Sequence, residues 1–313
     1  LGKWQKFMDD CKRYHLTPIL RLATEGDLAN TSVWRKPTYM DIIDFANFLN
    51  SLEWPVKNRY VIVFNEVNRG DEWAGAADPA EYAEILSFAV TVFHLKTSDF
   101  FVISAGLDNA APHQPPKYIN QYEYMKQMSA AVPGVFNQVD GLSSHSYPNP
   151  GFAQPPNITK AMGTGSFYFE RRLAKLLSNK DLPVFITETG WNTKAVSQET
   201  QAEYYKQAFE TVWNDPNVVT VAPFLLQGSG GPFQGFSLLD GGGNPNPVYR
   251  AIENLPKQKG APTLTAVLAA ETNREDEKIE TAPKIDFAKK LRKKEPFLPI
   301  GVVMEVYKWL VRI

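Results

Sequence analysis

The chain has 313 residues, a formal net charge of −1 at neutral pH and a pI near 6.5. This balance of charge argues against a nucleic-acid-binding protein or a partner for polyanions, because both need a strongly basic surface. The single cysteine, Cys11, excludes an intrachain disulfide. No apolar run reaches the roughly 18 residues that a membrane span needs.

The first third of the chain predicts two helices and two strands. Residues 2–14 carry apolar side chains at helical spacing, so they predict an amphipathic helix rather than a signal peptide. The chain begins with Leu rather than Met, which fits a mature form or a fragment. A short strand is expected at 17–23 and a helix from residue 38. The run VIVF at 61–64 then predicts a strand that is buried on both faces, as in parallel sheets.

The same alternation continues to residue 255. We expect helices at 79–95, 118–132, 164–178, 198–213 and 248–255, and strands at 100–105, 139–147, 183–188 and 218–226. Six strands that alternate with helices predict right-handed parallel crossovers. The carboxyl ends of all six strands therefore meet at one edge.

Both an open doubly wound sheet and a (β/α)8 barrel fit this alternation. No GxGxxG motif follows a strand and no GxxxxGK[ST] motif occurs, so a nucleotide-binding open sheet has little support. Barrels place functional residues at the ends of several strands, which favours an α/β fold of the TIM-barrel class. Residues 1–256 then supply strands three to eight, and the first two strands are missing.

The composition changes after residue 256. Residues 257–313 begin with a linker-like segment and continue with polar and basic runs. They are interpreted as a linker and tail, or as the start of an incomplete second domain. A helix that lies on a membrane surface is an alternative for this segment.

Two carboxylates end buried strands. Glu66 follows the strand at 61–64, and Glu188 ends the strand at 183–188. Hydrolysis of a glycosidic bond needs a proton donor and either a nucleophile or an activated water, and a pair of carboxyl groups can supply both. The alternative is that each Glu caps a helix or pairs with an arginine.

The sequence around these residues resembles clan A of the glycoside hydrolases, the retaining (β/α)8 enzymes that include cellulases, mannanases and β-xylosidases. The resemblance rests on Asn65-Glu66 at strand four, on the ITETGW segment with Glu188 at strand seven, and on the SSHSYPNP segment at strand six. It implies that Glu66 is the acid/base, that Glu188 is the nucleophile, and that Tyr147 hydrogen-bonds the nucleophile. Asn65 would bind the sugar 2-hydroxyl. The reaction would be double displacement on a β-linked oligo- or polysaccharide.

Further side chains are expected to contact the substrate. Arg21, if it points into the cleft, would keep Glu188 ionised. His145 either hydrogen-bonds the substrate or satisfies the core. Sugars present apolar C–H faces to aromatic rings, so loop aromatics on the expected active face are candidates for contact: Trp34, Trp73, Tyr147 and Trp191. The clan often has a Trp at the end of strand eight, where Phe224 and Gln227 are the nearest substitutes in this chain.

Two other functions remain open. One is a catalytically inactive barrel that binds carbohydrate, and the other is an open α/β enzyme that uses one of these Glu residues for different acid–base chemistry. His15, His94 and His113 form no zinc-like cluster, so we expect no metal and no cofactor. A carbohydrate is the expected partner, and a polysaccharide substrate favours an extracellular or cell-envelope location. The oligomeric state is not predicted.

Overall fold

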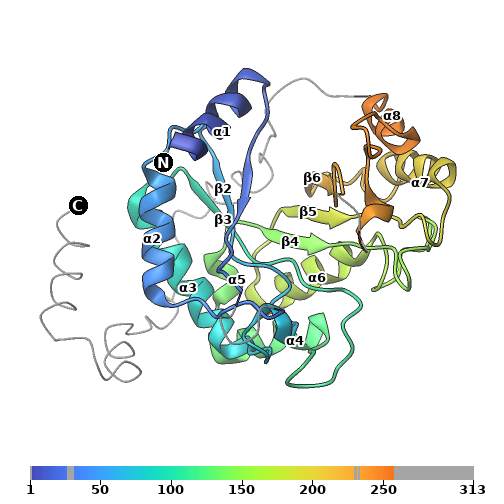
Figure 1. The fold of residues 1–313 in the computed structure, drawn as a ribbon. Helices are drawn as coiled ribbons and strands as arrows, with labels where there is room; N and C mark the ends of the chain where they lie inside the picture. Colours follow the sequence, from blue (N-terminus) through green and yellow to red (C-terminus); the bar gives the residue numbers. More distant parts are fainter. Residues whose placement is uncertain (1, 27–31, 229–230, 232, 257–313) are drawn as a thin grey trace, which may run out of the picture. The chain divides into compact units, whose positions relative to one another are not determined.

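A computed structural model describes residues 2–26, 32–228, 231 and 233–256 (Figure 1). The predicted tail or incomplete second domain at 257–313 lies outside the described residues. None of the described helices is both long and apolar enough to cross a membrane.

Six strands alternate with helices, as the sequence predicts. They form two parallel three-stranded sheets: β1 (Ile19–Arg21), β2 (Arg59–Ile62) and β3 (Phe100–Ile103) in one, and β4 (Leu142–His145), β5 (Val184–Thr189) and β6 (Val218–Pro223) in the other. Within each sheet the strands follow chain order, so the C-terminal ends of neighbours lie together.

The expected single sheet is interrupted between β3 and β4. Isolated parallel bridges join Ile103 to Gly141 and Asp108 to His145 at this seam. The N–H of Asp140 also donates to the carbonyl oxygen of Val102 at 2.9 Å. The two sheets are therefore successive parts of one strand series.

Aromatic rings in the interior show that this series is curved. Tyr60 of β2 and Phe101 of β3 both contact Phe185 of β5, with ring centroids 5.4 and 5.6 Å apart. Tyr60 and Phe101 are also 5.3 Å apart. Rings from both sheets can meet in this way only where the wall bends around them, as in a barrel. The fold is thus a (β/α)8-type barrel that is incomplete in the described residues.

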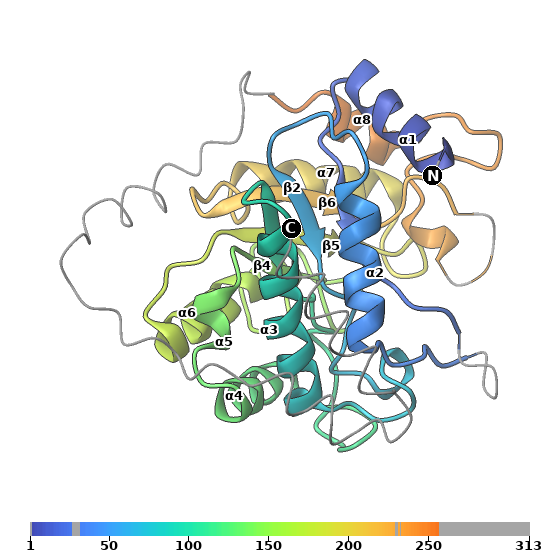
Figure 2. The ribbon, with the colours of Figure 1, turned by 90° about the vertical axis from the view of Figure 1, so that its left-hand side faces the viewer.

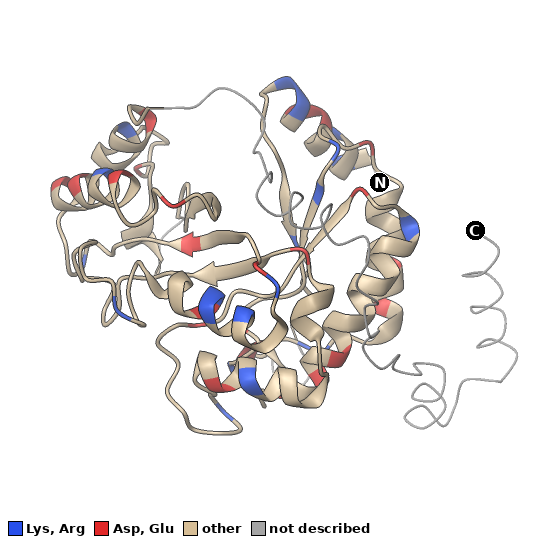
Figure 3. Cartoon of the chain, turned by 180° about the vertical axis from the view of Figure 1, so that it is seen from behind, with Lys and Arg blue, Asp and Glu red and all other residues tan. Residues whose placement is uncertain are grey.

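Helices cover the outer faces of the strands (Figures 1 and 2). They are α1 (Gly2–Arg13), α2 (Tyr39–Asn50), α3 (Pro79–Lys96), α4 (Gln121–Ala131), α5 (Val135–Gln138), α6 (Ser166–Ser178), α7 (Gln198–Glu210) and α8 (Pro247–Glu253). Their starts follow local chemistry: Thr38 and Asp41 form a capping box on α2, and Asp78 caps α3 before Pro79. Lys, Arg, Asp and Glu lie mostly on these helices and on loops (Figure 3).

Packing differs between the central and the outermost strands. All four residues of β4 are buried, whereas every residue of the apolar β6 is only half-buried. The short β1 is likewise partly exposed, and it is shorter than the strand expected at 17–23. Among the described residues, each of these two strands pairs with one neighbour in its sheet. Their exposure is what an open edge of a barrel predicts.

Candidate active site

Glu66 is held at the end of β2 by an unusual backbone. Phe64 has φ +70° and Glu66 has φ +35°, a region that residues with a side chain rarely adopt. The N–H of Glu66 donates to the carbonyl oxygen of Gly106 at 2.9 Å, in the loop after β3. Strained backbone of this kind costs about 1–3 kcal/mol per residue and gathers at functional sites.

Glu188 lies near the C-terminal end of β5, opposite His145 of β4. The register between these strands shifts at Ser144/His145, which is a bulge-like irregularity. Such irregularities re-aim side chains near active sites. As a result the carboxylate from the second sheet faces the one that follows the first sheet.

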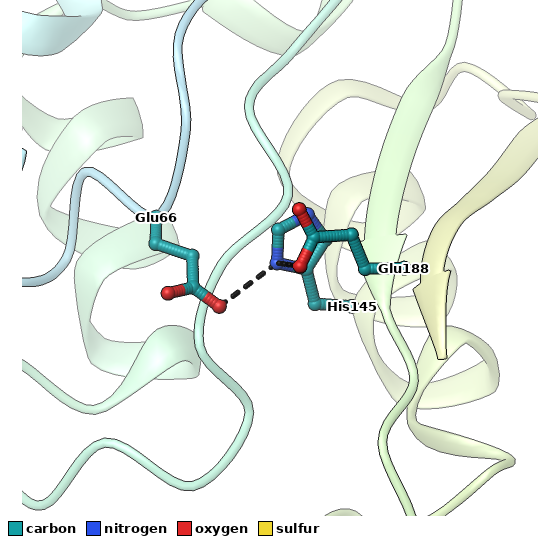
Figure 4. Close-up of side chains that lie close together, drawn as sticks. All are labelled: Glu66, His145 and Glu188. Carbon is teal, nitrogen blue, oxygen red and sulfur yellow. Dashed lines mark hydrogen bonds and ion pairs between the residues drawn. The ribbon is translucent and has the colours of Figure 1, made fainter. Parts of the chain in front are cut away.

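The two carboxylates converge on the imidazole of His145 (Figure 4). Nδ1 of His145 lies 2.9 Å from Oε1 of Glu66 and 3.7 Å from Oε2 of Glu188. A carboxyl oxygen of Glu66 lies within 4.8 Å of one of Glu188. The side chains of Glu66 and Glu188 are 14% and 12% exposed, and that of His145 is 1% exposed. The pair is therefore largely removed from water and still reachable.

The electrostatics of the site favour an ionised Glu188. Burial alone would raise the pKa of Glu188, but the charges of His145 and Arg21 outweigh it, and the pKa lies below its ordinary value. Burial alone would lower the pKa of His145, yet the negative charges of Glu188 and Glu66 raise it overall. The charges of His145 and Glu188 therefore each favour the ionised form of the other.

Arg21 and Tyr147 contact Glu188, and Asn65 contacts Arg21. Nη1 of Arg21 donates to Oε1 of Glu188 at 2.5 Å and to Oδ1 of Asn65 at 2.6 Å. The hydroxyl of Tyr147 donates to Oε2 of Glu188 at 3.0 Å. Both oxygens of Glu188 therefore accept hydrogen bonds, which hold the carboxylate in one orientation. His145 is hydrogen-bonded to Glu66 and almost fully covered, so it is not open to a ligand as a substrate contact would require.

Sequence reasoning missed four charged residues near Glu66. Arg69 lies 3.5 Å from Oε2 of Glu66 and 3.5 Å from Asp108, and it forms a two-pronged pair with Asp71. Glu72 accepts a hydrogen bond from Nδ2 of Asn65 at 3.0 Å. Residues 69–72 read RGDE directly after the Asn65-Glu66 element. That polar run was the available signal.

The structure corrects the expectation for two tryptophans. Trp73 is 1% exposed and donates to Glu81 of α3, and Trp191 is fully buried with its Nε1 donating to the carbonyl oxygen of Gln154. Trp191 packs against aromatic rings under α7, among them Tyr205. Neither indole has a free face for a sugar ring, so both stabilise their loops.

A further group of aromatic side chains packs around Tyr147, which contacts Glu188. The ring of Tyr147 packs edge-on against those of Phe152, Phe224 and Phe236, at centroid distances of 5.2, 6.1 and 6.0 Å. Phe224, which follows β6, is one of the two predicted substitutes for the clan's Trp at strand eight, the other being Gln227. Phe233 contacts it and is 55% exposed. Trp34 is 41% exposed in the loop before α2.

The donor atoms of Glu66, His145 and Glu188 could also form a cation site, because they lie within 4.8 Å of one another. However, the outer oxygens of the two carboxylates already face Arg21 and Arg69. These guanidinium groups balance the negative charge without a metal ion, so the arrangement suits acid–base and nucleophilic chemistry.

Comparisons with known proteins identify the family and the fold. The model of the glycosyl hydrolase catalytic core family matches residues 31–251. Among solved structures, the chain is similar to a family 39 glycoside hydrolase from Bacteroides cellulosilyticus, with a TM-score of 0.58, 18% identity, and coverage of 80% of this chain and 53% of that chain. It is also similar to a monomeric β-xylosidase from Caulobacter crescentus, with a TM-score of 0.58, 16% identity, and coverage of 82% of this chain and 57% of that chain.

A glucosidase from Croceicoccus marinus gives a TM-score of 0.57 at 13% identity, with coverage of 80% of this chain and 50% of that chain. The chain thus spans about half the length of these solved proteins, and at these identities the likeness concerns the fold. The search of curated proteins gave no match. Because the family model covers well over half of its residues, the chain belongs to the glycosyl hydrolase catalytic core family.

Proposed function

We propose that this chain carries the catalytic site of a retaining glycosidase that cleaves β-linked oligo- or polysaccharides. The observation that carries the proposal is the separation of the two carboxyl groups. One carboxyl oxygen of Glu66 and one of Glu188 lie within 4.8 Å of each other. Retaining enzymes hold this pair about 5–5.5 Å apart, whereas inverting enzymes leave about 6.5–9.5 Å for a water molecule.

In the first step, an oxygen of Glu188 attacks the anomeric carbon and forms a glycosyl ester. The bond to the leaving oxygen breaks, and protonated Glu66 gives its proton to that oxygen. In the second step, Glu66 accepts a proton from water, the water oxygen attacks the anomeric carbon, and Glu188 leaves as a carboxylate. The contacts of Glu188 with Arg21 and Tyr147 support its role, because both stabilise the ionised form.

Asn65 would bind the sugar hydroxyl next to the anomeric carbon. Its position directly before Glu66 in the chain and its hydrogen bond with Arg21 support this role. The half-buried Phe224 and the exposed Phe233 and Trp34 offer ring faces for sugars. Among the proteins of similar fold, one is named a β-xylosidase and another a glucosidase, so xylosides and glucosides are the first substrates to screen.

The test compares wild type with Glu66→Gln and Glu188→Gln on a panel of aryl β-glycosides. Both substitutions keep the shape of the side chain and remove its acid–base or nucleophilic function. We expect each to lower kcat/KM by at least about 1,000-fold, since these groups act directly on the bonds that change. Glu203→Gln, at an exposed position of α7, is the matched control and should leave kcat/KM unchanged.

Two measurements then test the mechanism. Proton NMR of the first-formed sugar should show the β-anomer, because double displacement retains configuration. A 2-deoxy-2-fluoro glycoside should label the peptide that contains Glu188. An α-product refutes the retaining mechanism, and carbohydrate binding without turnover by the wild type favours the inactive-barrel alternative.

A further inference from the structure

A third carboxylate, Glu72, lies beside the two already described. It belongs to the short 3-10 helix η1 (Gly70–Glu72), six residues after Glu66. Its Oε1 accepts a hydrogen bond from Nδ2 of Asn65 at 3.0 Å. Oδ1 of Asn65 accepts from Nη1 of Arg21 at 2.6 Å, and the same nitrogen donates to Glu188 at 2.5 Å. Hydrogen bonds therefore connect Glu72 with Glu188 through two intermediate side chains.

These contacts determine which end of the Asn65 amide points where. The two ends of an amide have nearly the same shape, but the oxygen accepts hydrogen bonds and the nitrogen donates them. The guanidinium of Arg21 can only donate, so it selects the oxygen. An ionised Glu72 can only accept, so it selects the nitrogen. The second N–H of that nitrogen is left for a ligand hydroxyl.

The surrounding backbone makes this orientation matter. Asn65 stands between Phe64 at φ +70° and Glu66 at φ +35°, so both neighbours occupy the left-handed region. A rigid, strained segment cannot easily re-aim its side chain by a change of backbone angle. The hydrogen bonds to Arg21 and Glu72 then hold the two ends of the amide, and the one to Glu72 holds the nitrogen end.

The pKa of Glu72 depends on its burial and on its neighbours. Burial raises its pKa to about 7, with a further contribution from the negative charge of Glu66, while the hydrogen bond from Asn65 acts in the opposite direction. Its side chain is half-buried, unlike that of the adjacent Trp73, which is covered. Glu72 is thus partly accessible, beside the covered Trp73.

We propose that Glu72 is a positioning residue of the reaction: it fixes the amide of Asn65 so that one N–H is aimed at the sugar hydroxyl next to the anomeric carbon. This inference rests on the proposed function, because it assigns Glu72 a role in the same site. It extends the site to a residue that neither donates the reacting proton nor attacks the sugar.

The test uses two substrates that differ by that hydroxyl, an aryl β-glycoside and its 2-deoxy analogue. Glu72→Ala should lower kcat/KM for the ordinary glycoside by about 10- to 100-fold, as expected for a hydrogen bond to a charged group. The loss should fall on kcat more than on KM, since this contact strengthens in the transition state. For the 2-deoxy analogue, kcat/KM of the same variant should lie within about 2-fold of wild type, because this substrate lacks the hydroxyl that Asn65 would bind.

Further variants separate positioning from a structural role. Glu72→Gln keeps an acceptor oxygen and should recover most of the activity on the ordinary glycoside. Glu72→Asp retains the charge, but its carboxylate is one methylene further from Asn65, so its activity should resemble that of Glu72→Ala. It replaces Glu72→Ala in the test if that variant does not fold. Glu81→Gln is the control, because Glu81 accepts a hydrogen bond from the neighbouring Trp73 and, within the described part of the chain, makes no hydrogen bond with Asn65. It should affect both substrates equally.

The outcomes distinguish the inference from the function on which it rests. Equal losses on both substrates with Glu72→Ala, or no loss on either, overturn the role of Glu72 while leaving the glycosidase activity in place. A wild type that hydrolyses neither substrate overturns the proposed function and this inference with it. A loss confined to the ordinary glycoside, with recovery in Glu72→Gln, supports both.

Discussion

The substitution Gly106→Ala tests how closely the site is packed around His145. Gly106 follows β3, and its carbonyl oxygen accepts the N–H of Glu66 at 2.9 Å. A Cβ atom at this position would lie 2.5 Å from Nε2 of His145 and 2.8 Å from Oγ of Ser143. Both separations are too short for real atoms, so the side chains have to move.

The size of the movement sets the expected effect. Ordinary contact begins near 3.4 Å, so the imidazole has to retreat by about 1 Å. Overpacking of this kind costs about 1–3 kcal/mol of stability, or roughly 2–4 °C in Tm per kcal/mol for a chain of this size. A shift of about 1 Å in a group that positions reacting atoms can lower the rate on the order of 100-fold. We therefore expect Gly106→Ala to lose activity well below its unfolding temperature.

Gly141→Ala is the matched control for overpacking alone. Its Cβ would lie 3.0 Å from the rings of Phe101 and Phe185 in the interior, away from the carboxylates. Thermal unfolding and kcat/KM should be measured for both variants on the same aryl glycoside. Both should lose stability, and only Gly106→Ala should lose activity at a temperature where both are folded. Activity and Tm of Gly106→Ala within error of wild type would refute the packing argument.

Two further predictions concern hydroxyl and carboxyl groups. Tyr147→Phe keeps the ring packing but removes the hydrogen bond that helps to lower the pKa of Glu188, so the acid limb of the kcat/KM–pH profile should move to higher pH and kcat/KM should fall by about 10- to 100-fold. Tyr205→Phe, whose hydroxyl donates to a backbone carbonyl, should leave that limb in place; an unmoved limb in Tyr147→Phe would contradict the assignment. Burial raises the pKa of Glu170 in α6 to about 7, so the folded protein binds an extra proton between about pH 4.5 and 7 and loses stability as pH rises through that range. Glu170→Gln removes this loss. In urea unfolding, the free energy of unfolding of the variant relative to wild type should therefore rise from pH 5 to pH 8 by an amount on the order of 3 kcal/mol. The same difference at both pH values would count against the prediction.

The sequence predicted the strand series well because its signals are local. Apolar, β-branched runs of four to six residues mark buried strands, and their alternation with helices leaves parallel pairing as the solution. The placement of Glu66, His145 and Glu188 on one face followed from strand direction alone. The seam between β3 and β4 could not be foreseen, because it depends on register between strands that are distant in the sequence.

The side chains around the carboxylates were harder to predict because loops are arranged by tertiary packing. Trp191 follows Glu188 by three residues, which suggested a sugar platform, but its indole turns outward and packs under α7. Trp191 gave a misleading signal, whereas Glu72 gave none, because a polar residue in a polar run carries no periodic pattern. Only the folded chain brings it to Asn65.

The rings of Tyr60, Phe101 and Phe185 fill the space between the two sheets. Glu66 follows the first sheet and Glu188 belongs to the second, so the distance between their carboxyl groups is a distance between two sheets. An increase of about 1–1.5 Å over the retaining spacing leads to the geometry that admits a water molecule for inversion. Under the proposed mechanism, the volume of these interior rings would therefore help to set the configuration of the released sugar, although the rings do not belong to the site itself.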